Sequence, residues 1–147
     1  MASNPLIREL MRAIALGDGS KMKELNSRLP DADRDDYVIR VAAMFAGVVG
    51  HVFEHDQSPE AIRDFIAKIS YAYRNAEPPF KPLAMEALIR ALLGEDDLLD
   101  EVAAEDQLDI EILTIRMITD QYPKVRDNLE EYLNDAETLA VHWEAES

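Results

Sequence analysis

Two histidines and a glutamate stand close together at His51-Val52-Phe53-Glu54-His55, where their residue types could bind a metal ion. If this segment is helical, His51 and His55 lie four residues apart on one face, so both imidazoles can reach the same ion. Glu54 would then be placed to act as a general base on a metal-bound water molecule. The spacing therefore suggests a zinc site with hydrolytic chemistry.

The order H-x-x-E-H resembles the motif of the inverted zincin proteases, over these five residues. The resemblance implies a small zinc-dependent hydrolase that uses His51, Glu54 and His55. The known enzymes are much longer chains with an acidic third ligand downstream. The alternative is that packing fixes this helix: at about 100° per residue, His55 falls at the edge of the apolar stripe and His51 on its flank. We favour packing and keep the metal-dependent hydrolase as an alternative function.

A second motif, D-D-x-x-D, is formed by Asp96, Asp97 and Asp100. It is similar to the magnesium-diphosphate motif of helical prenyl-chain enzymes, in which carboxylates on one helix face bind Mg²⁺. Those enzymes are larger, and this sequence has no second acidic motif with a basic clamp. An acidic first turn of a helix that follows Gly94 explains the same residues through the helix dipole, and we favour this interpretation.

The acidic residues are distributed unevenly along the chain. Residues 1–90 hold 12 basic and 13 acidic side chains, a net charge of −1, whereas residues 91–147 hold 3 basic and 17 acidic ones, a net charge of −14. The chain therefore divides into a near-neutral part and a strongly acidic part. Between Arg90 and Arg116 there is no Lys or Arg. In that interval the candidate partner-binding residues are Glu95, Asp96, Asp97, Asp100, Glu101, Glu105, Asp106 and Asp109.

A surface with this charge suits a basic partner and disfavours direct binding to nucleic acid or to an anionic membrane. We therefore expect a non-enzymatic helical interaction or regulatory module that binds a basic protein partner through its acidic C-terminal helices. Glu130, Glu131 and Asp135 would add to the steering, and Tyr122 or Trp143 would supply an apolar anchor. Three alternatives stay open: an acidic inhibitor that mimics DNA, a structural homo-oligomer such as a homodimer, and acidity that only keeps the protein soluble.

Several functional classes are excluded or disfavoured by composition. The chain has no cysteine, which excludes disulfides, thiolate zinc sites and cysteine nucleophiles. Arg8, Glu9 and Arg12 interrupt the first amphipathic stretch, so it does not read as a signal-peptide core. The longest uncharged run falls short of the roughly 18–20 apolar residues that a membrane span needs. A cytoplasmic protein is the simplest expectation.

The elements that must position these residues are predicted to be helices. Apolar residues recur at three- and four-residue steps, and prolines and glycines stand where helices begin and end. We predict an all-α fold, a single compact bundle of about six to eight helices over residues 1–147. The expected helices cover about 5–16, 20–28, 31–55, 59–73, 82–93 and 105–121, with a further element from about 95 and a last helix from Pro123.

Three features of this scheme are open. The segment Leu108–Met117 begins with an alternating pattern typical of a strand, but no hairpin partner is near and we favour helix. A proline-rich loop is expected at 75–82. A weak echo relates Pro5…Gly17 to Pro82…Gly94, as a duplicated pair of helices would, although two unrelated helices with the same start and stop residues explain it more simply.

Overall fold

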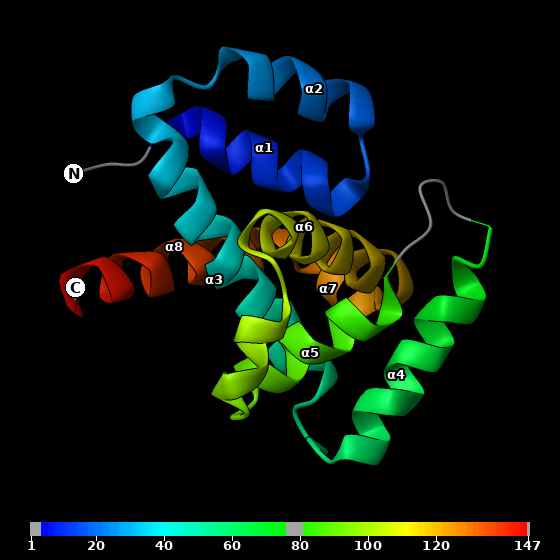
Figure 1. The fold of residues 1–147 in the computed structure, drawn as a ribbon. Helices are drawn as coiled ribbons and strands as arrows, with labels where there is room; N and C mark the ends of the chain where they lie inside the picture. Colours follow the sequence, from blue (N-terminus) through cyan, green and yellow to red (C-terminus); the bar gives the residue numbers. More distant parts are fainter. Residues whose placement is uncertain (1–3, 76–80, 147) are drawn as a thin grey trace.

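The computed structural model describes residues 4–75 and 81–146, and within these ranges the chain is helical with no strand (Figure 1). The predicted all-α fold is therefore confirmed. The α-helices are α1 (Pro5–Leu16), α2 (Gly19–Arg28), α3 (Arg34–Val52), α4 (Pro59–Ala72), α5 (Pro82–Leu92), α6 (Ala104–Gln121), α7 (Pro123–Asp127) and α8 (Leu129–Glu146). Two 3₁₀-helices, η1 (Asp31–Asp33) and η2 (Asp96–Glu101), precede α3 and α6.

Local capping chemistry sets the helix starts. The Asn4 side chain accepts a hydrogen bond from the backbone N–H of Leu6, and Pro5 occupies the first turn of α1. The Ser58 side chain does the same for the N–H of Ala61, with Pro59 at the start of α4. Gly17 ends α1 at a φ of 69°, a left-handed conformation that glycine adopts without steric cost.

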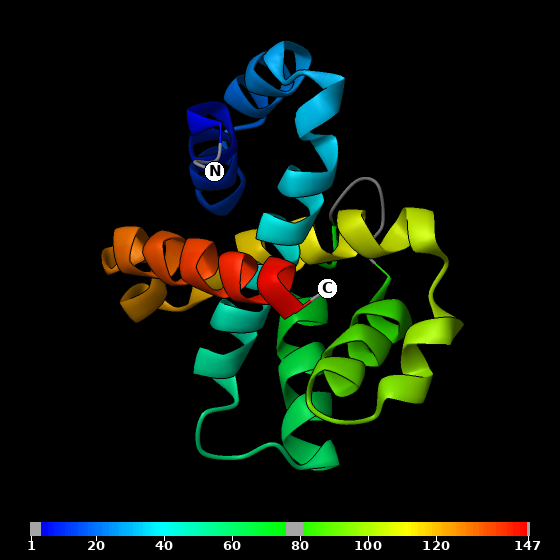
Figure 2. The ribbon, with the colours of Figure 1, turned by 90° about the vertical axis from the view of Figure 1, so that its left-hand side faces the viewer.

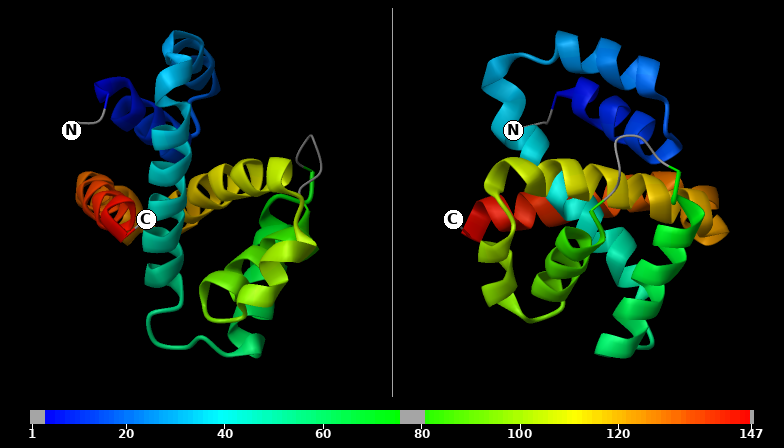
Figure 3. Two further views of the ribbon diagram at one scale, coloured as in Figure 1. Left: turned by 60° about the vertical axis from the view of Figure 1, so that its left-hand side comes forward. Right: turned by 45° about the vertical axis from the view of Figure 1, so that its right-hand side comes forward.

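The core joins the near-neutral and the acidic parts of the sequence. One hydrophobic cluster contains buried residues from each α-helix, and α3 packs chiefly against α6 and α8. Figure 3 shows α3 standing upright, with α8 on one side and α6 on the other. In Figure 2, α1 and α2 lie at one end of the molecule, and α4 and α5 lie at the other. The helix expected at about 31–55 corresponds to α3, which occupies this central place.

Three predicted elements differ from the structure. The third helix ends at Val52 and not near His55, because the Phe53 side chain turns into the core, where its ring meets Phe65 edge-on at 5.5 Å between centroids. The last helix is divided in two at Asn128, whose side chain donates to the Lys124 carbonyl at 2.7 Å. Such a side-chain bond competes with regular helix hydrogen bonding. The element that starts near Glu95 is the 3₁₀-helix η2.

Leu108–Met117 lies entirely within α6, so the alternating pattern is helical here. Of the loop at 75–82, residues 76–80 lie outside the described ranges, and Pro82 begins α5. The two halves of the sequence echo share a helix that begins with proline, but α1 leads into the α-helix α2 whereas α5 leads into the 3₁₀-helix η2. No helix in the described ranges is long and apolar enough to cross a membrane.

Candidate functional site

The His51–His55 motif straddles the end of α3. His51 lies in the last turn of the helix and is partly buried, with its ring edge-on to the rings of Tyr122 and Tyr132 at 6.2 Å between centroids in each case. Glu54 and His55 follow the helix end, and the His55 side chain is 92% exposed. His51 therefore packs between two tyrosines, and His55 stands in solvent.

This geometry corrects the premise of a helical metal site. Two histidines four residues apart share a face only inside a helix, and the helix stops at Val52. The expectation that His55 lies at the edge of the core is also wrong, since its side chain is almost fully exposed. In the ranges 4–75 and 81–146, no group of three or more His, Asp or Glu side chains is arranged to hold a metal ion.

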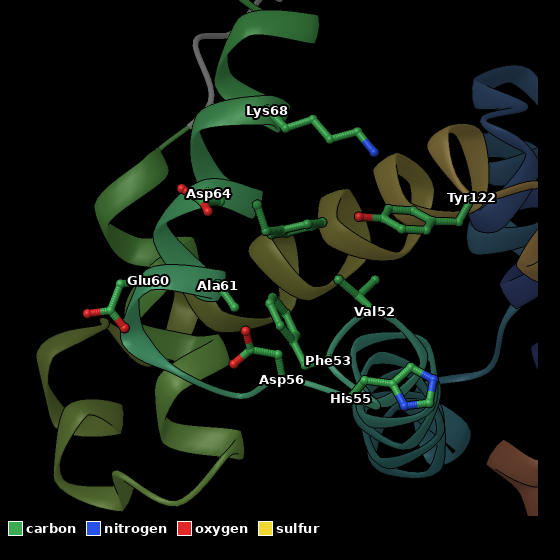
Figure 4. A pocket seen from close by; sticks show the side chains of 10 residues that line it. Val52, Phe53, His55, Asp56, Glu60, Ala61, Asp64, Lys68 and Tyr122 are labelled. Atoms are coloured by element: carbon green, nitrogen blue, oxygen red, sulfur yellow. The ribbon is translucent and has the colours of Figure 1, made fainter.

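A pocket of about 420 Å³ opens beside this motif, between the end of α3 and the first turns of α4 (Figure 4). His55 and Asp56 lie on one side of it, and Lys68 reaches across toward Tyr122, with its Nζ 4.4 Å from the centre of the ring. Asp56 accepts a hydrogen bond from the N–H of Ser58 at 2.9 Å, and this bond lowers the pKa of the Asp56 carboxyl. Asp56 thus shapes the turn before α4, and Lys68 forms a cation–π contact.

The eight predicted partner-binding acids lie on η2, on its flanking residues and on the first turns of α6. Two of them are paired: Glu95 with Arg90 at 2.6 Å, and Asp106 with Lys81 at 3.6 Å. The other six are exposed and form no ion pair or hydrogen bond with any residue of the described ranges. We call these six the η2–α6 acidic segment: Asp96, Asp97, Asp100, Glu101, Glu105 and Asp109. In Figure 2 the chain that carries them runs along the right-hand edge of the molecule.

Arg90 fixes the start of this region. Its guanidinium donates to Glu95 Oε2 and Oε1, at 2.6 and 2.9 Å, and to Glu86 Oε2 at 3.2 Å. These hydrogen bonds lower the pKa of Glu95 and raise that of Arg90. The bidentate contact ties the end of α5 to the residue before η2. Glu95 therefore acts as a local structural partner, and its charge is compensated within the chain.

Glu130 on α8, which was expected to help steer a basic partner, is paired within the chain. It lies 2.7 Å from Arg12 and 3.2 Å from Arg8, and Arg8 also reaches Glu137 at 3.3 Å. The hydrogen bond from Arg12 is the main cause that lowers the pKa of Glu130 to about 2. Glu130 thus joins α8 to α1. Its predicted companions in steering, Glu131 and Asp135, are exposed on the same helix.

Two charged residues gain importance that the sequence did not reveal. Arg40 is 3% exposed; its Nε lies 2.9 Å from Asp36 Oδ1, too obliquely for a hydrogen bond, and its Nη1 donates to the Glu137 carbonyl at 3.4 Å. Glu111 on α6 is partly buried, and burial raises its pKa to about 7. Its apolar neighbours in the sequence, Ile110 and Ile112, do not reveal this burial, because Asp109 also stands between apolar residues and is exposed.

Comparison with protein families, with curated proteins and with solved structures found no match for this chain. Three arrangements among the described residues bear on function: the pocket beside His55, the η2–α6 acidic segment and the surroundings of Glu111.

Proposed function

We propose that this chain is a non-enzymatic helical interaction module that binds a basic protein partner through the η2–α6 acidic segment. The observation that supports the proposal is the pairing state of the acids. Six exposed carboxylates between Asp96 and Asp109 have no cationic partner in the described ranges, although Arg90 and Lys81 neutralise acids immediately beside them.

Such a group of charges is costly to the folded chain on its own. Like charges repel over about 8 Å at physiological salt, so acids on a two-turn 3₁₀-helix and the adjoining helix start act on one another. The first turn of α6 offsets part of this repulsion through the helix dipole, which favours Glu105 at that place. A basic partner would offset the remaining repulsion, and long-range electrostatic attraction would accelerate its association.

The local structure is consistent with a binding surface, because η2 contributes little to the hydrophobic core. No residue of η2 is buried, in contrast to the buried stripes of α6 and α8. Substitutions of Asp96, Asp97 or Asp100 therefore leave the core intact, and a loss of binding can be separated from a loss of folding.

The test compares two sets of charge reversals that change the net charge equally. The first variant carries Asp96→Lys, Asp97→Lys and Asp100→Lys. The control variant carries Glu9→Lys, Asp64→Lys and Asp127→Lys, which are exposed acids of α1, α4 and α7 outside the proposed surface. Wild type and both variants are immobilised and used to capture proteins from a lysate of the native host at low salt.

We expect wild type and the control to retain the same basic proteins and to release them as salt is raised. The first variant should not retain these proteins. If the two variants retain these proteins equally, the position of the acids in the fold does not matter, and the acidic segment is rejected as the binding surface. Retained proteins that DNA displaces competitively would point to DNA mimicry as the form of the interaction.

A further inference from the structure

An apolar hollow lies directly beside the η2–α6 acidic segment. Its volume is about 230 Å³ and it opens to solvent. α3, α5, η2, α6 and α8 all contribute to its walls, with Phe45, Leu88 and Trp143 among the apolar lining residues. Leu92 and Leu99, also in the lining, are 39% and 43% exposed, which is high for leucine side chains. The hollow is therefore a pocket whose rim includes two exposed leucine side chains.

Two carboxylates, and no cation, line this hollow. Asp96 belongs to the acidic segment, and Glu111 comes from α6. The lining residues of α3, α5 and α8 are all apolar, and Glu111 forms no ion pair or hydrogen bond with the described residues. Burial in these surroundings raises the pKa of Glu111 to about 7. A cation that enters beside Glu111 would therefore find an ionisable acid without an internal partner.

We propose that this hollow receives a large apolar side chain from a basic segment of a protein partner, while lysine or arginine residues flanking that side chain pair with Asp96 and Glu111. The inference rests on the function proposed above and names the anchor of the same interface. Interfaces of this kind gain most of their affinity from a few apolar anchors in pockets, and charge pairs at the rim add specificity.

Size and charge both favour this occupant. A volume of about 230 Å³ is below the roughly 300–1,000 Å³ of typical small-molecule sites, and it suits an individual side chain. A second copy of this chain would bring a net charge of −15 toward the acidic segment, so repulsion opposes it. A basic segment brings the complementary charge.

Trp143 gives a direct readout, because it lines the hollow and is the single tryptophan of the chain. The probes are a short leucine–lysine peptide with leucines at amphipathic-helix spacing, the same composition in scrambled order, and oligolysine. Each is titrated at low salt into the full chain, with Trp143 emission and calorimetry as readouts. We expect the amphipathic peptide to bind tightest and to shift the emission of Trp143, and oligolysine to bind weakly without a shift.

The matched variants are Leu92→Ser with Leu99→Ser at the hollow, and Leu16→Ser as the control, since Leu16 is a 56% exposed leucine on α1. Losing two leucine contacts should weaken binding of the amphipathic peptide about tenfold or more, leave oligolysine binding unchanged, and abolish the shift of Trp143 emission. Leu16→Ser should change none of these. Circular dichroism and thermal unfolding verify that each variant is folded.

The outcomes separate the hollow from the acidic segment. Equal affinity for the three probes with unchanged Trp143 emission would overturn the inference and leave the acidic segment in place. An affinity for the amphipathic peptide that is unchanged by the reversal of Asp96, Asp97 and Asp100 would overturn the pairing with Asp96 and also contradict the proposed function. Absence of binding to any probe would reject both. Concentration-dependent dimerisation that quenches or shifts Trp143 without peptide would assign the hollow to a second copy.

The role of Glu111 is tested by pH. An entering cation favours the ionised carboxylate, so affinity for the amphipathic peptide should rise severalfold from about pH 6 to about pH 8. Because other ionisable groups also respond to pH, the measured quantity is the difference between wild type and Glu111→Gln. We expect the variant to lose part of the pH dependence. An identical pH profile in the variant would show that Glu111 does not face the bound cation.

Discussion

Two acidic regions of this chain, α8 and the η2–α6 acidic segment, have similar composition and opposite relations to the fold. On α8, Glu130 and Glu137 are paired with Arg8 and Arg12 of α1, more than 100 residues away in the sequence. Around η2 and the start of α6, Glu95 pairs with Arg90 of α5 and Asp106 pairs with Lys81, the residue before α5, while six other acids have no partner in the described ranges. The difference shows that net charge does not reveal which acids support the structure.

A third kind of acid sharpens this contrast. Glu111 is neither paired like Glu130 nor exposed like Asp109, and it stands in a mostly apolar hollow. Pairing lowers the pKa of Glu130 to about 2, whereas burial raises that of Glu111 to about 7. The two acids should therefore respond to pH and to mutation in opposite directions.

The largest effect is expected for Glu111→Gln. The folded state holds a proton on Glu111 up to a pH of about 7, and the unfolded state releases it near 4.5. The free energy of unfolding therefore falls as pH rises through this window, by about 1–3 kcal/mol when it is complete. Glutamine does not ionise, so the variant avoids this fall in the free energy of unfolding. It should be more stable than wild type at about pH 8 and similar to it at about pH 4. Urea unfolding at both pH values measures this.

Asp109→Asn is the matched control, because Asp109 is an exposed acid on the same helix. It should leave the free energy of unfolding unchanged at both pH values. If Glu111→Gln gave no gain at about pH 8, then Glu111 would be solvated when ionised and would belong with the exposed acids.

A smaller effect of opposite sign is expected for Glu130→Lys. The pKa of Glu130 is lowered in the folded state, so its pairing stabilises the chain above a pH of about 4.5 and loses this contribution as pH falls toward 2. Reversal places a cation beside Arg8 and Arg12 and should lower the free energy of unfolding by about 1–2 kcal/mol at neutral pH. The side chain is 58% exposed, so solvent screening keeps the effect moderate.

Glu131→Lys, at the next position on α8, is the control for this effect. Glu131 is exposed and forms no ion pair in the described ranges, so its reversal should leave stability close to that of wild type. Urea unfolding at neutral pH and low salt compares the two, and high salt should reduce the loss in Glu130→Lys. Equal losses in both variants would mean that α8 responds to charge in general, and the distinction between structural and free acids would fail there.

How much the sequence could predict depends on the range of the interactions. Helix starts at Pro5 and Pro59 follow from the capping residues next to them and were predicted correctly. The end of α3 depends on Phe53 packing against Phe65, a tertiary contact, so the helical placement of His55 was wrong. The hypothesis of a metal site at the histidine motif rested on this local spacing alone.

The acidic region shows the same limit. The position of the charge at 91–147 is visible in the sequence, and so is the short-range partner Arg90 of Glu95. The pairing of Glu130 with Arg12 spans 118 positions and needs the fold. Of the two aromatic anchors expected, Trp143 lies with Asp96 around one hollow, whereas Tyr122 lines the pocket beside His55. The packing of α8 against α3 places Trp143 beside Asp96, and the periodicity of the sequence does not predict this packing.

The smallest effect on stability is expected where the effect on binding is largest. Reversing Asp96, Asp97 and Asp100 to lysine removes repulsion among exposed acids that have no partner in the described ranges, on a 3₁₀-helix without a buried residue. The free energy of unfolding should therefore change by no more than about 0.5 kcal/mol, upward at low salt, and the change should vanish at high salt. Urea unfolding at two salt concentrations measures it. A loss like that of Glu130→Lys would mean that these acids support the fold as α8 does, and the contrast between the two regions would be void.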